Sequence, residues 1–247
     1  MVGVRSAAVA AVLVTLATSG CAALSGAARD PRDPWQSYNR AMFRFNTDVD
    51  NAFLKPLARG YRAIAPLPVD RGITNFFANL ATLPSVANNL LQFKLGRASS
   101  ELSRVAVNTT VGALGVFDVA TNLGIPSHME DFGQTLGYWG IGAGPYLVLP
   151  LLGPSSARDA FGVAGDLLLD PLFSIPKSRV YWGAVGVRTI DRRADLLAAG
   201  DIAATAALDP YIFMRDAYLQ RRRGAARDGH HPAAEDDAFW DALEQSR

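Results

Sequence analysis

Residues 73–96 read ITNFFANLATLPSVANNLLQFKLG, and the spacing of their apolar side chains predicts helices. Apolar residues return at intervals of three and four, which places them on one face of a helix. They are Ile73, Phe76, Phe77, Leu80 and Leu83. Proline has no backbone N–H and its ring clashes with the preceding turn, so Pro84 is expected to end this helix. A second helix is then expected over residues 85–95, with Gly96 at its end.

The same pattern continues toward the C-terminus. Helices are expected over residues 100–111 and 117–123, because a glycine follows each stretch. Ser156 and Asp159 have the spacing of a capping box, which predicts a helix start. Apolar residues on one side define this helix and a later one: Ala157, Phe161, Ala164 and Leu168, and then Val187, Ile190, Ala194 and Leu197. No useful length of sequence alternates as a strand does, so the prediction is an all-α fold of short helices in a single domain.

Several of these helices carry apolar residues over a wider arc than one buried stripe requires. The arc is wide around Phe76 and Phe77, at residues 90–93 and at residues 167–169. Such a helix is either buried on two sides or presents a second apolar face to lipid. In the second case the protein would lie in one leaflet of a membrane rather than cross it.

Composition excludes several classes of protein. The chain has 247 residues, of which 49% are hydrophobic, and its net charge is +1. This hydrophobic content suits a globular domain, while a nucleic-acid-binding protein would be expected to show a basic stripe. With one cysteine, Cys21, the chain can form no internal disulfide and no cysteine-based metal site.

The N-terminus has the layout of a secretory signal. Arg5 precedes an apolar run over residues 7–17, and Cys21 follows small residues at the cleavage position. This arrangement resembles a bacterial lipobox, which predicts a signal peptide over 1–20, covalent diacylglycerol on Cys21 and a lipidated linker over 21–34. Ala22 at the next position, by the same resemblance, points to the outer membrane. An ordinary signal peptide with an incidental cysteine is the alternative.

Enzyme chemistry finds little support in the residues. His128 is the only histidine outside the polar tail, and Ser155 and Ser156 do not form a nucleophile elbow. Glu130 and Asp131 are adjacent, so their side chains should diverge and serve in helix capping or ion pairs rather than as an acid/base pair. The prediction is that the protein is not an enzyme; a phospholipase and a structural scaffold are the alternatives.

A family resemblance spans residues 33–223. The blocks that carry it are DPWQSYNRAMFRFNTDVDNAFLKPLARGYRAIAP, NFFANL, NNLLQFK, VNTTVGALGVFDVA, EDFGQTLGYWGIGAGPYLVLPLLGPSSARD and DPYIFMRDAYLQRR. In this order they resemble the MlaA/VacJ family of outer-membrane lipoproteins. The resemblance implies that residues 35–223 form a helical ring around an amphipathic channel in the inner leaflet. It also implies phospholipid as the transported ligand, with a porin trimer and a soluble periplasmic carrier as partners and no other cofactor.

The glycine-rich stretch at 130–154, EDFGQTLGYWGIGAGPYLVLPLLGP, is expected to line and hinge that channel. Glycine permits tight turns and close approach of a ligand to the backbone. The candidate lining residues are Trp139, Ile141, Gly142, Gly144, Pro145, Tyr146, Leu147, Phe76 and Phe77. Pro145 should hold residue 144 in an extended conformation. A buried packing loop is the main alternative; a nucleotide-phosphate loop lacks the strand before it and the helix after it.

The C-terminal residues 224–247 are expected to form a flexible tail with a short acidic amphipathic helix. Phe239, Trp240 and Leu243 share one face of it among acidic residues. This pattern is typical of a peptide that docks on a partner, here the periplasmic carrier, although a solvated tail without a role has the same composition.

Overall fold

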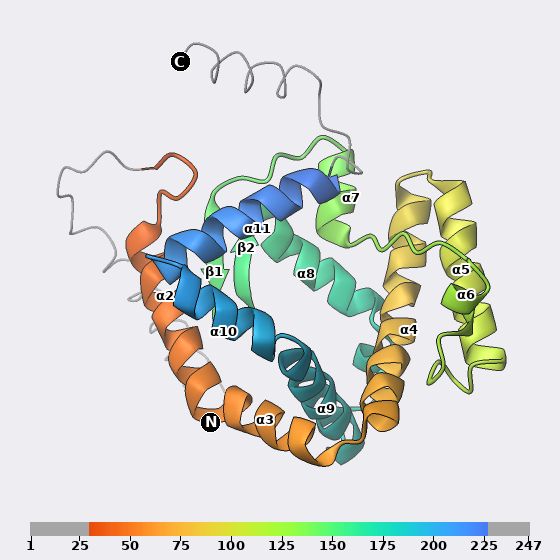
Figure 1. The fold of residues 1–247 in the computed structure, drawn as a ribbon. Helices are drawn as coiled ribbons and strands as arrows, with labels where there is room; N and C mark the ends of the chain where they lie inside the picture. Colours follow the sequence, from red (N-terminus) through yellow and green to blue (C-terminus); the bar gives the residue numbers. More distant parts are fainter. Residues whose placement is uncertain (1–29, 227–247) are drawn as a thin grey trace, which may run out of the picture.

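The computed structural model describes residues 30–226 and consists almost entirely of helices (Figure 1). In chain order the elements are α2 Gln36–Val49, η2 Asp50–Leu54, α3 Lys55–Ile64, α4 Leu67–Leu91, α5 Leu95–Thr110, α6 Val119–Asn122, α7 Phe132–Tyr138, β1 Tyr146–Leu149, β2 Gly153–Ser156, α8 Ala157–Leu169, η3 Pro171–Ser174, α9 Arg179–Asp195, α10 Leu197–Ala206 and α11 Pro210–Ala226. The predicted all-α class is confirmed apart from one short hairpin.

The helices are arranged as a ring (Figure 1). From α2 the chain passes through η2, one π-helical stretch, into α3, which packs against α9. α4 follows and packs along α5, which lies with α6 outside the ring. α8 follows β2 directly and runs from the hairpin toward the α4 side, and α11 lies above the hairpin in the view of Figure 1. Elements from both ends of the chain therefore complete the ring.

α4 is one continuous helix, so the predicted end at Pro84 is wrong. The helix runs from Leu67 to Leu91 with Pro84 inside it. A proline removes one helical hydrogen bond, and the packing of α4 along α5 outweighs that local cost. The helix ends instead at Leu91, with Gln92 as its C-cap, and Phe93 then has a φ of 58°. α5 begins at Leu95, earlier than expected.

Two short strands correct the prediction that no strand is present. β1 and β2 pair antiparallel, with Tyr146 opposite Ser156 and Leu149 opposite Gly153. Leu151 and Gly153 have φ values of 63° and 85° and make the turn. Four residues per strand are too few for alternation to be recognised in the sequence, although Tyr146 and Val148 do alternate as buried positions.

The ends predicted before Gly112 and Gly124 agree to within one residue with those of α5 and α6, and capping side chains mark the starts of α7 and α8. The Ser156 hydroxyl accepts a hydrogen bond from the backbone N–H of Asp159 at 3.2 Å, as the capping pattern predicts. Asp131 caps α7 in the same way, accepting from the N–H of Gln134 at 2.8 Å. The carboxylate of Asp159 does not complete the capping box, because it is engaged by α11.

The hydrophobic core lies where the hairpin, α2 and α11 meet. Tyr146, Val148, Tyr211 and Tyr218 form its buried centre, and Phe43 packs at its edge. The ring of Tyr146 lies 6.3 Å from that of Tyr211 and 5.9 Å from that of Tyr218. These aromatic contacts attach α11, the last element of the described chain, to the hairpin.

Ordered contacts begin before residue 35, inside the segment predicted to be a linker. Asp33 is buried and accepts hydrogen bonds from the Tyr211 hydroxyl and, at 2.8 Å, from the Asn39 amide. Arg215 forms an ion pair with Asp30 at 3.1 Å. A composition rich in Asp and Pro therefore does not mark a free linker here, because α11 supplies partners for its carboxylates.

Candidate functional site

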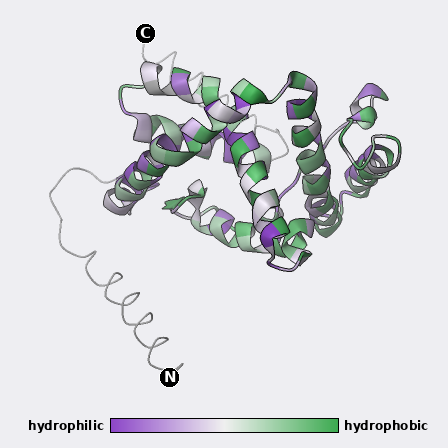
Figure 2. Ribbon diagram, turned by 90° about the horizontal axis from the view of Figure 1, so that it is seen from below, coloured by the Kyte–Doolittle hydropathy of each residue, from purple (hydrophilic) through white to green (hydrophobic). Residues whose placement is uncertain are grey.

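The ring buries many polar side chains and exposes many apolar ones. Among the described residues most buried positions are polar or charged, whereas large apolar side chains are exposed on nearly every long helix. In α8, Arg158 and Asp159 are buried, while Phe161 and Leu168 are 74% and 73% exposed. Figure 2 shows hydrophobic residues recurring along the helices. The exposed apolar side chains suit an apolar environment better than water.

The wide apolar arcs are buried at one place and exposed at two others. Phe77 is buried and packs edge-on against Phe76 at 5.3 Å, so this part of α4 belongs to the interior. Residues 90, 91 and 93 and residues 167–169 are exposed. Within residues 30–226, no helix combines the length and hydropathy needed to cross a bilayer.

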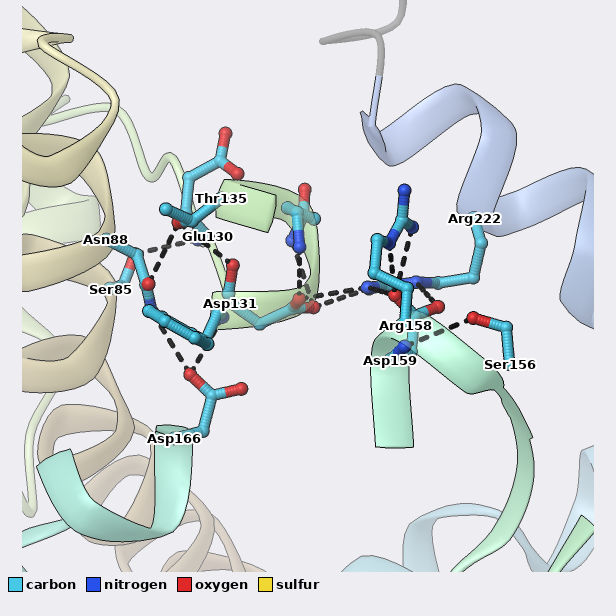
Figure 3. A network of polar contacts seen from close by, with 12 residues as sticks. Ser85, Asn88, Glu130, Asp131, Thr135, Ser156, Arg158, Asp159, Asp166 and Arg222 are labelled. Atoms are coloured by element: carbon cyan, nitrogen blue, oxygen red, sulfur yellow. Dashed lines mark hydrogen bonds and ion pairs between the residues drawn. The ribbon is translucent and has the colours of Figure 1, made fainter. Parts of the chain in front are cut away.

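A polar network joins α4 to the segment that leads into α7 (Figure 3). The Ser85 hydroxyl accepts from the Glu130 N–H at 2.8 Å. The Asn88 amide accepts from the Thr135 hydroxyl at 2.9 Å and donates to Asp166 of α8 at 3.1 Å. Burial raises the pKa of Asp166 to about 6, and the nearby Asp131 carboxylate adds to the rise. Three elements are thus held together by buried side-chain hydrogen bonds.

A second network joins α7, α8 and α11 through one arginine. Arg222 donates to both oxygens of Asp131 and to both oxygens of Asp159. Asp159 also accepts from Arg158 at 2.9 Å and from the Tyr218 hydroxyl. Although burial opposes ionisation, the hydrogen bonds from Arg222 hold the pKa of both carboxyls below the usual range. Both groups are therefore ionised in the folded protein at neutral pH.

The predicted roles of Glu130 and Asp131 in capping and ion pairing are confirmed. Asp131 caps α7 and pairs with Arg222. Glu130 is buried and lies 3.1 Å from the Lys94 ammonium and 3.6 Å from the Arg97 guanidinium. In the part of the chain that the structure describes, no group of three or more histidine, cysteine, aspartate or glutamate residues could hold a metal ion.

The glycine-rich segment between α7 and β1 takes the turns that its composition predicts. Gly140 and Gly144 have φ values of 89° and 67°, which a residue with a side chain rarely adopts. The left-handed backbone at Gly144 contradicts the extended conformation expected before Pro145. Hydrogen bonds from α8 fix the backbone instead. The Arg158 N–H donates to the Ala143 carbonyl, and the Ala157 N–H donates to the Pro145 carbonyl.

The predicted lining residues do not share one surface. Tyr146 is fully buried in the aromatic core and Phe77 is buried in α4, so both are packing residues. Leu147 and Pro145 are half-buried, and Phe76 is likewise partly covered. Trp139, Ile141, Gly142 and Gly144 are exposed. For these exposed members, contact with lipid stays a prediction. Cys21 and the three tail residues Phe239, Trp240 and Leu243 lie outside the described residues.

Trp139 lines an open apolar cavity of about 640 Å³ between the ends of α4, α7 and α8. Leu90, Leu91, Phe93 and Leu169 contribute to it. The indole N–H of Trp139 donates to the Leu91 carbonyl at 3.1 Å, so the side chain presents its apolar part to the cavity. The cavity can accept an apolar group such as an acyl chain.

A second cavity, of about 440 Å³, lies beside the other end of the glycine-rich segment. Ala143 and Gly144 line it together with the start of α8, the end of α11 and Arg32. Four of its lining residues are arginines, which no feature of the sequence had singled out as a group. Arg158 and Arg222 are 64 positions apart and meet only because both contact Asp159.

Comparison with known proteins gives consistent matches. A profile of the MlaA lipoprotein family matches residues 31–225. The intermembrane phospholipid transport system lipoprotein MlaA of Escherichia coli (strain K12) is 33% identical over 227 residues, which are 89% of this chain and 88% of that protein. The corresponding Haemophilus influenzae protein is 30% identical over 234 residues, which are 89% of this chain and 90% of that protein.

A solved structure is also similar. It was described as the structural basis for maintenance of bacterial outer membrane lipid asymmetry, and it aligns with a TM-score of 0.69 and 36% identity. The alignment covers 80% of this chain and all of the other. An uncharacterised protein of Rickettsia felis is 36% identical over 195 residues, 78% of this chain and 77% of its own length.

Proposed function

The chain belongs to the MlaA lipoprotein family, and on that basis we propose that it takes mislocalised phospholipid from the outer leaflet of the outer membrane and passes it to a periplasmic carrier. Its relatives are lipoproteins of an intermembrane phospholipid transport system. The similar solved structure concerns the maintenance of outer-membrane lipid asymmetry. This function makes the protein a transporter of lipid rather than an enzyme.

The energetics of lipid transfer explain why a protein is needed. A phospholipid with two acyl chains would expose about 30 methylenes in water, each costing about 0.8 kcal/mol. The total of roughly 25 kcal/mol makes free transfer through water negligible. A transporter lowers this barrier if it offers an apolar route to the chains and a wet route to the headgroup, and no covalent chemistry is required.

The proposal is supported by the pairing of exposed large apolar side chains with buried polar ones in helices that are arranged as a ring (Figure 1). Exposed side chains such as Phe161 and Leu168 are stable in the acyl region of a leaflet, while buried amides such as Asn88 find partners inside. We place the ring in the inner leaflet, held there by acyl chains on Cys21. Two or more such chains anchor a protein stably.

The partners follow from the same family resemblance. A porin trimer would contact the ring from within the membrane, and a soluble carrier would receive lipid on the periplasmic side. We assign docking of the carrier to the tail helix with Phe239, Trp240 and Leu243, because an acidic amphipathic helix on a tether suits a soluble partner. The exposed part of the glycine-rich segment is the proposed lining of the lipid route.

Analysis of bound lipid tests the proposal. The protein is purified in mild detergent, incubated with phospholipid vesicles and extracted, with an unrelated lipoprotein that carries the same anchor as control. We expect intact phospholipid in excess of the control. Release of lysolipid would identify a phospholipase instead, and a lipid content equal to that of the control would leave only a scaffold.

A further inference from the structure

The arginine-lined cavity beside Gly144 has the features of an anion-binding site. Its walls come from the glycine-rich segment, the first turn of α8, the end of α11 and residues 31 and 32. These walls carry four arginines and one aspartate. The cavity therefore differs from the apolar cavity at Trp139, whose lining residues are all apolar.

Two of the four arginines are neutralised by carboxylates. Arg32 donates to both oxygens of Asp30, at 3.0 and 2.7 Å. Arg222 bridges Asp131 and Asp159, as Figure 3 shows. Their donors are largely used within the protein, so they shape the cavity rather than attract a ligand.

The other two arginines are Arg158 and Arg223. Arg158 is buried, and its acidic partner is the adjacent Asp159, whose two oxygens also accept from Arg222. One carboxylate is thus shared by two guanidinium groups. Arg223 is exposed at the rim and forms no ion pair with any residue in the range 30–226. Arg158 and Arg222 are together balanced by Asp131 and Asp159, so Arg223 is the guanidinium whose charge an incoming anion would balance.

Backbone amides add uncharged donors. The first turn of α8 is already satisfied, because its N–H groups donate to Pro145, Ala143 and the Ser156 hydroxyl. By contrast, the N–H groups of Ala143 and Gly144 have no acceptor among the described residues. The left-handed backbone at Gly144 leaves this part of the wall without side-chain atoms. A compact anion can approach such a wall closely.

Most of the remaining wall is apolar. Pro31, Leu219 and Tyr218 contribute to it, next to Ser156. A free inorganic ion would leave these apolar surfaces in contact with water, whereas an amphiphile would cover them with its glycerol and first methylenes. The combination of guanidinium groups, free amides and apolar wall matches the phosphodiester end of a phospholipid.

We propose that this cavity binds the phosphate of the transported phospholipid, with Arg158 and Arg223 as its charged donors, an inference that rests on the proposed function. The phosphate would be held beside the glycine-rich segment, so the cavity gives the lipid headgroup a defined position next to the proposed lining. Inorganic phosphate presents the same chemistry without the apolar part, and the test below separates the two.

The test is a titration followed by phosphorus NMR. The protein, purified in non-ionic detergent, is titrated with monomeric dihexanoyl phosphatidylethanolamine and, in parallel, with inorganic phosphate. Arg223→Gln is the test variant, since an exposed rim residue can be changed without disturbing the fold. Arg221→Gln is the matched control, because Arg221 is exposed, equally charged and outside the cavity lining.

We expect Arg223→Gln to weaken lipid binding about tenfold, because it removes one charge-assisted hydrogen bond. Arg221→Gln should leave lipid binding unchanged. Inorganic phosphate should bind much more weakly than the lipid. Equal effects of the two variants, or no effect of either, would overturn the site while leaving the transport function in place. Tight binding of phosphate without the lipid would overturn the headgroup assignment. If no lipid binds even to the unchanged protein, the proposed function fails as well.

Discussion

Two buried tyrosines in the same aromatic core differ in one property, the partner of the hydroxyl. Tyr211 donates its hydroxyl to the buried carboxylate of Asp33. The hydroxyl of Tyr146 is buried without a hydrogen-bond partner among the described residues. We expect Tyr211→Phe to lower the free energy of unfolding by about 1–3 kcal/mol, because it leaves a buried carboxylate short of a donor. Tyr146→Phe should be neutral or slightly stabilising. Thermal melting of both variants decides this.

A loss of stability in Tyr146→Phe equal to that in Tyr211→Phe would contradict the assignment of these hydrogen bonds. Since the two substitutions remove the same atom from the same cluster, each serves as the control for the other.

Gly142 and Gly144 also form a matched pair. A Cβ at Gly142 would meet nothing within 4 Å, whereas one at Gly144 would lie 3.1 Å from the Cβ of Ala157, at a φ of 67°. Gly144→Val should therefore destabilise the fold by about 1–3 kcal/mol through backbone strain and crowding. Gly142→Val should melt close to the unchanged protein. If the segment lines the lipid route, Gly142→Val should nevertheless reduce lipid transfer, measured as movement of labelled phospholipid between vesicles. Normal transfer by a folded Gly142→Val protein would remove this glycine from the lining.

Asp166 gives a pH dependence with a definite sign. Its pKa is raised to about 6 from an ordinary value of 3.8, so between these values the folded state holds a proton that the unfolded state has lost. The contribution of Asp166 to stability therefore falls as pH rises from about 4 to 6, and it is constant above pH 6. Asp166→Asn keeps an acceptor for Asn88 and removes the cost of ionisation. We expect the variant to be more stable at pH 7.5, by on the order of 1 kcal/mol, with the difference vanishing near pH 4. Urea unfolding at both pH values measures it; an equal difference at both would contradict the raised pKa.

At the scale of elements, the sequence predicts what local chemistry controls. Ser156 and Asp131 cap the helices that follow them, because a capping side chain accepts a hydrogen bond from the backbone N–H three residues later. Helix ends that depend on packing could not be predicted, and Pro84 within α4 is the clearest case. The hairpin was missed because four-residue strands owe their existence to pairing with a later segment.

Arg222 illustrates why the polar site was missed. Nothing in the sequence links this residue on α11 to Asp131 and Asp159, which lie 91 and 63 positions away. We expect Arg222→Met to lower the free energy of unfolding by about 3–5 kcal/mol, because it leaves Asp131 without its cation and Asp159 with Arg158 alone. Arg221→Met on the exposed side of the same helix should change it by less than about 0.5 kcal/mol. Chemical denaturation compares them, and a similar small effect of both would show that the bridge does not hold α11 in place.

The ring as a whole has one property that fits a family of membrane lipoproteins. The ring buries amides and ion pairs and exposes large apolar side chains, the reverse of what water favours. The wide apolar arcs indicated this possibility, but only the structure shows that residues 90–91 and 167–169 are exposed while Phe77 is buried. Which side of a helix faces inward depends on neighbours that a single sequence does not specify.

The most direct test of lipid transport is the phospholipid content of the outer leaflet in living cells. A strain lacking this protein is complemented with the unchanged protein or with Cys21→Ala, and whole cells are treated with an external phospholipase that reaches only the outer leaflet. We expect abundant lysophospholipid in the deletion strain and with Cys21→Ala, and little with the unchanged protein. Equal, low amounts of lysophospholipid in all three strains would contradict a role for the protein in keeping phospholipid out of the outer leaflet.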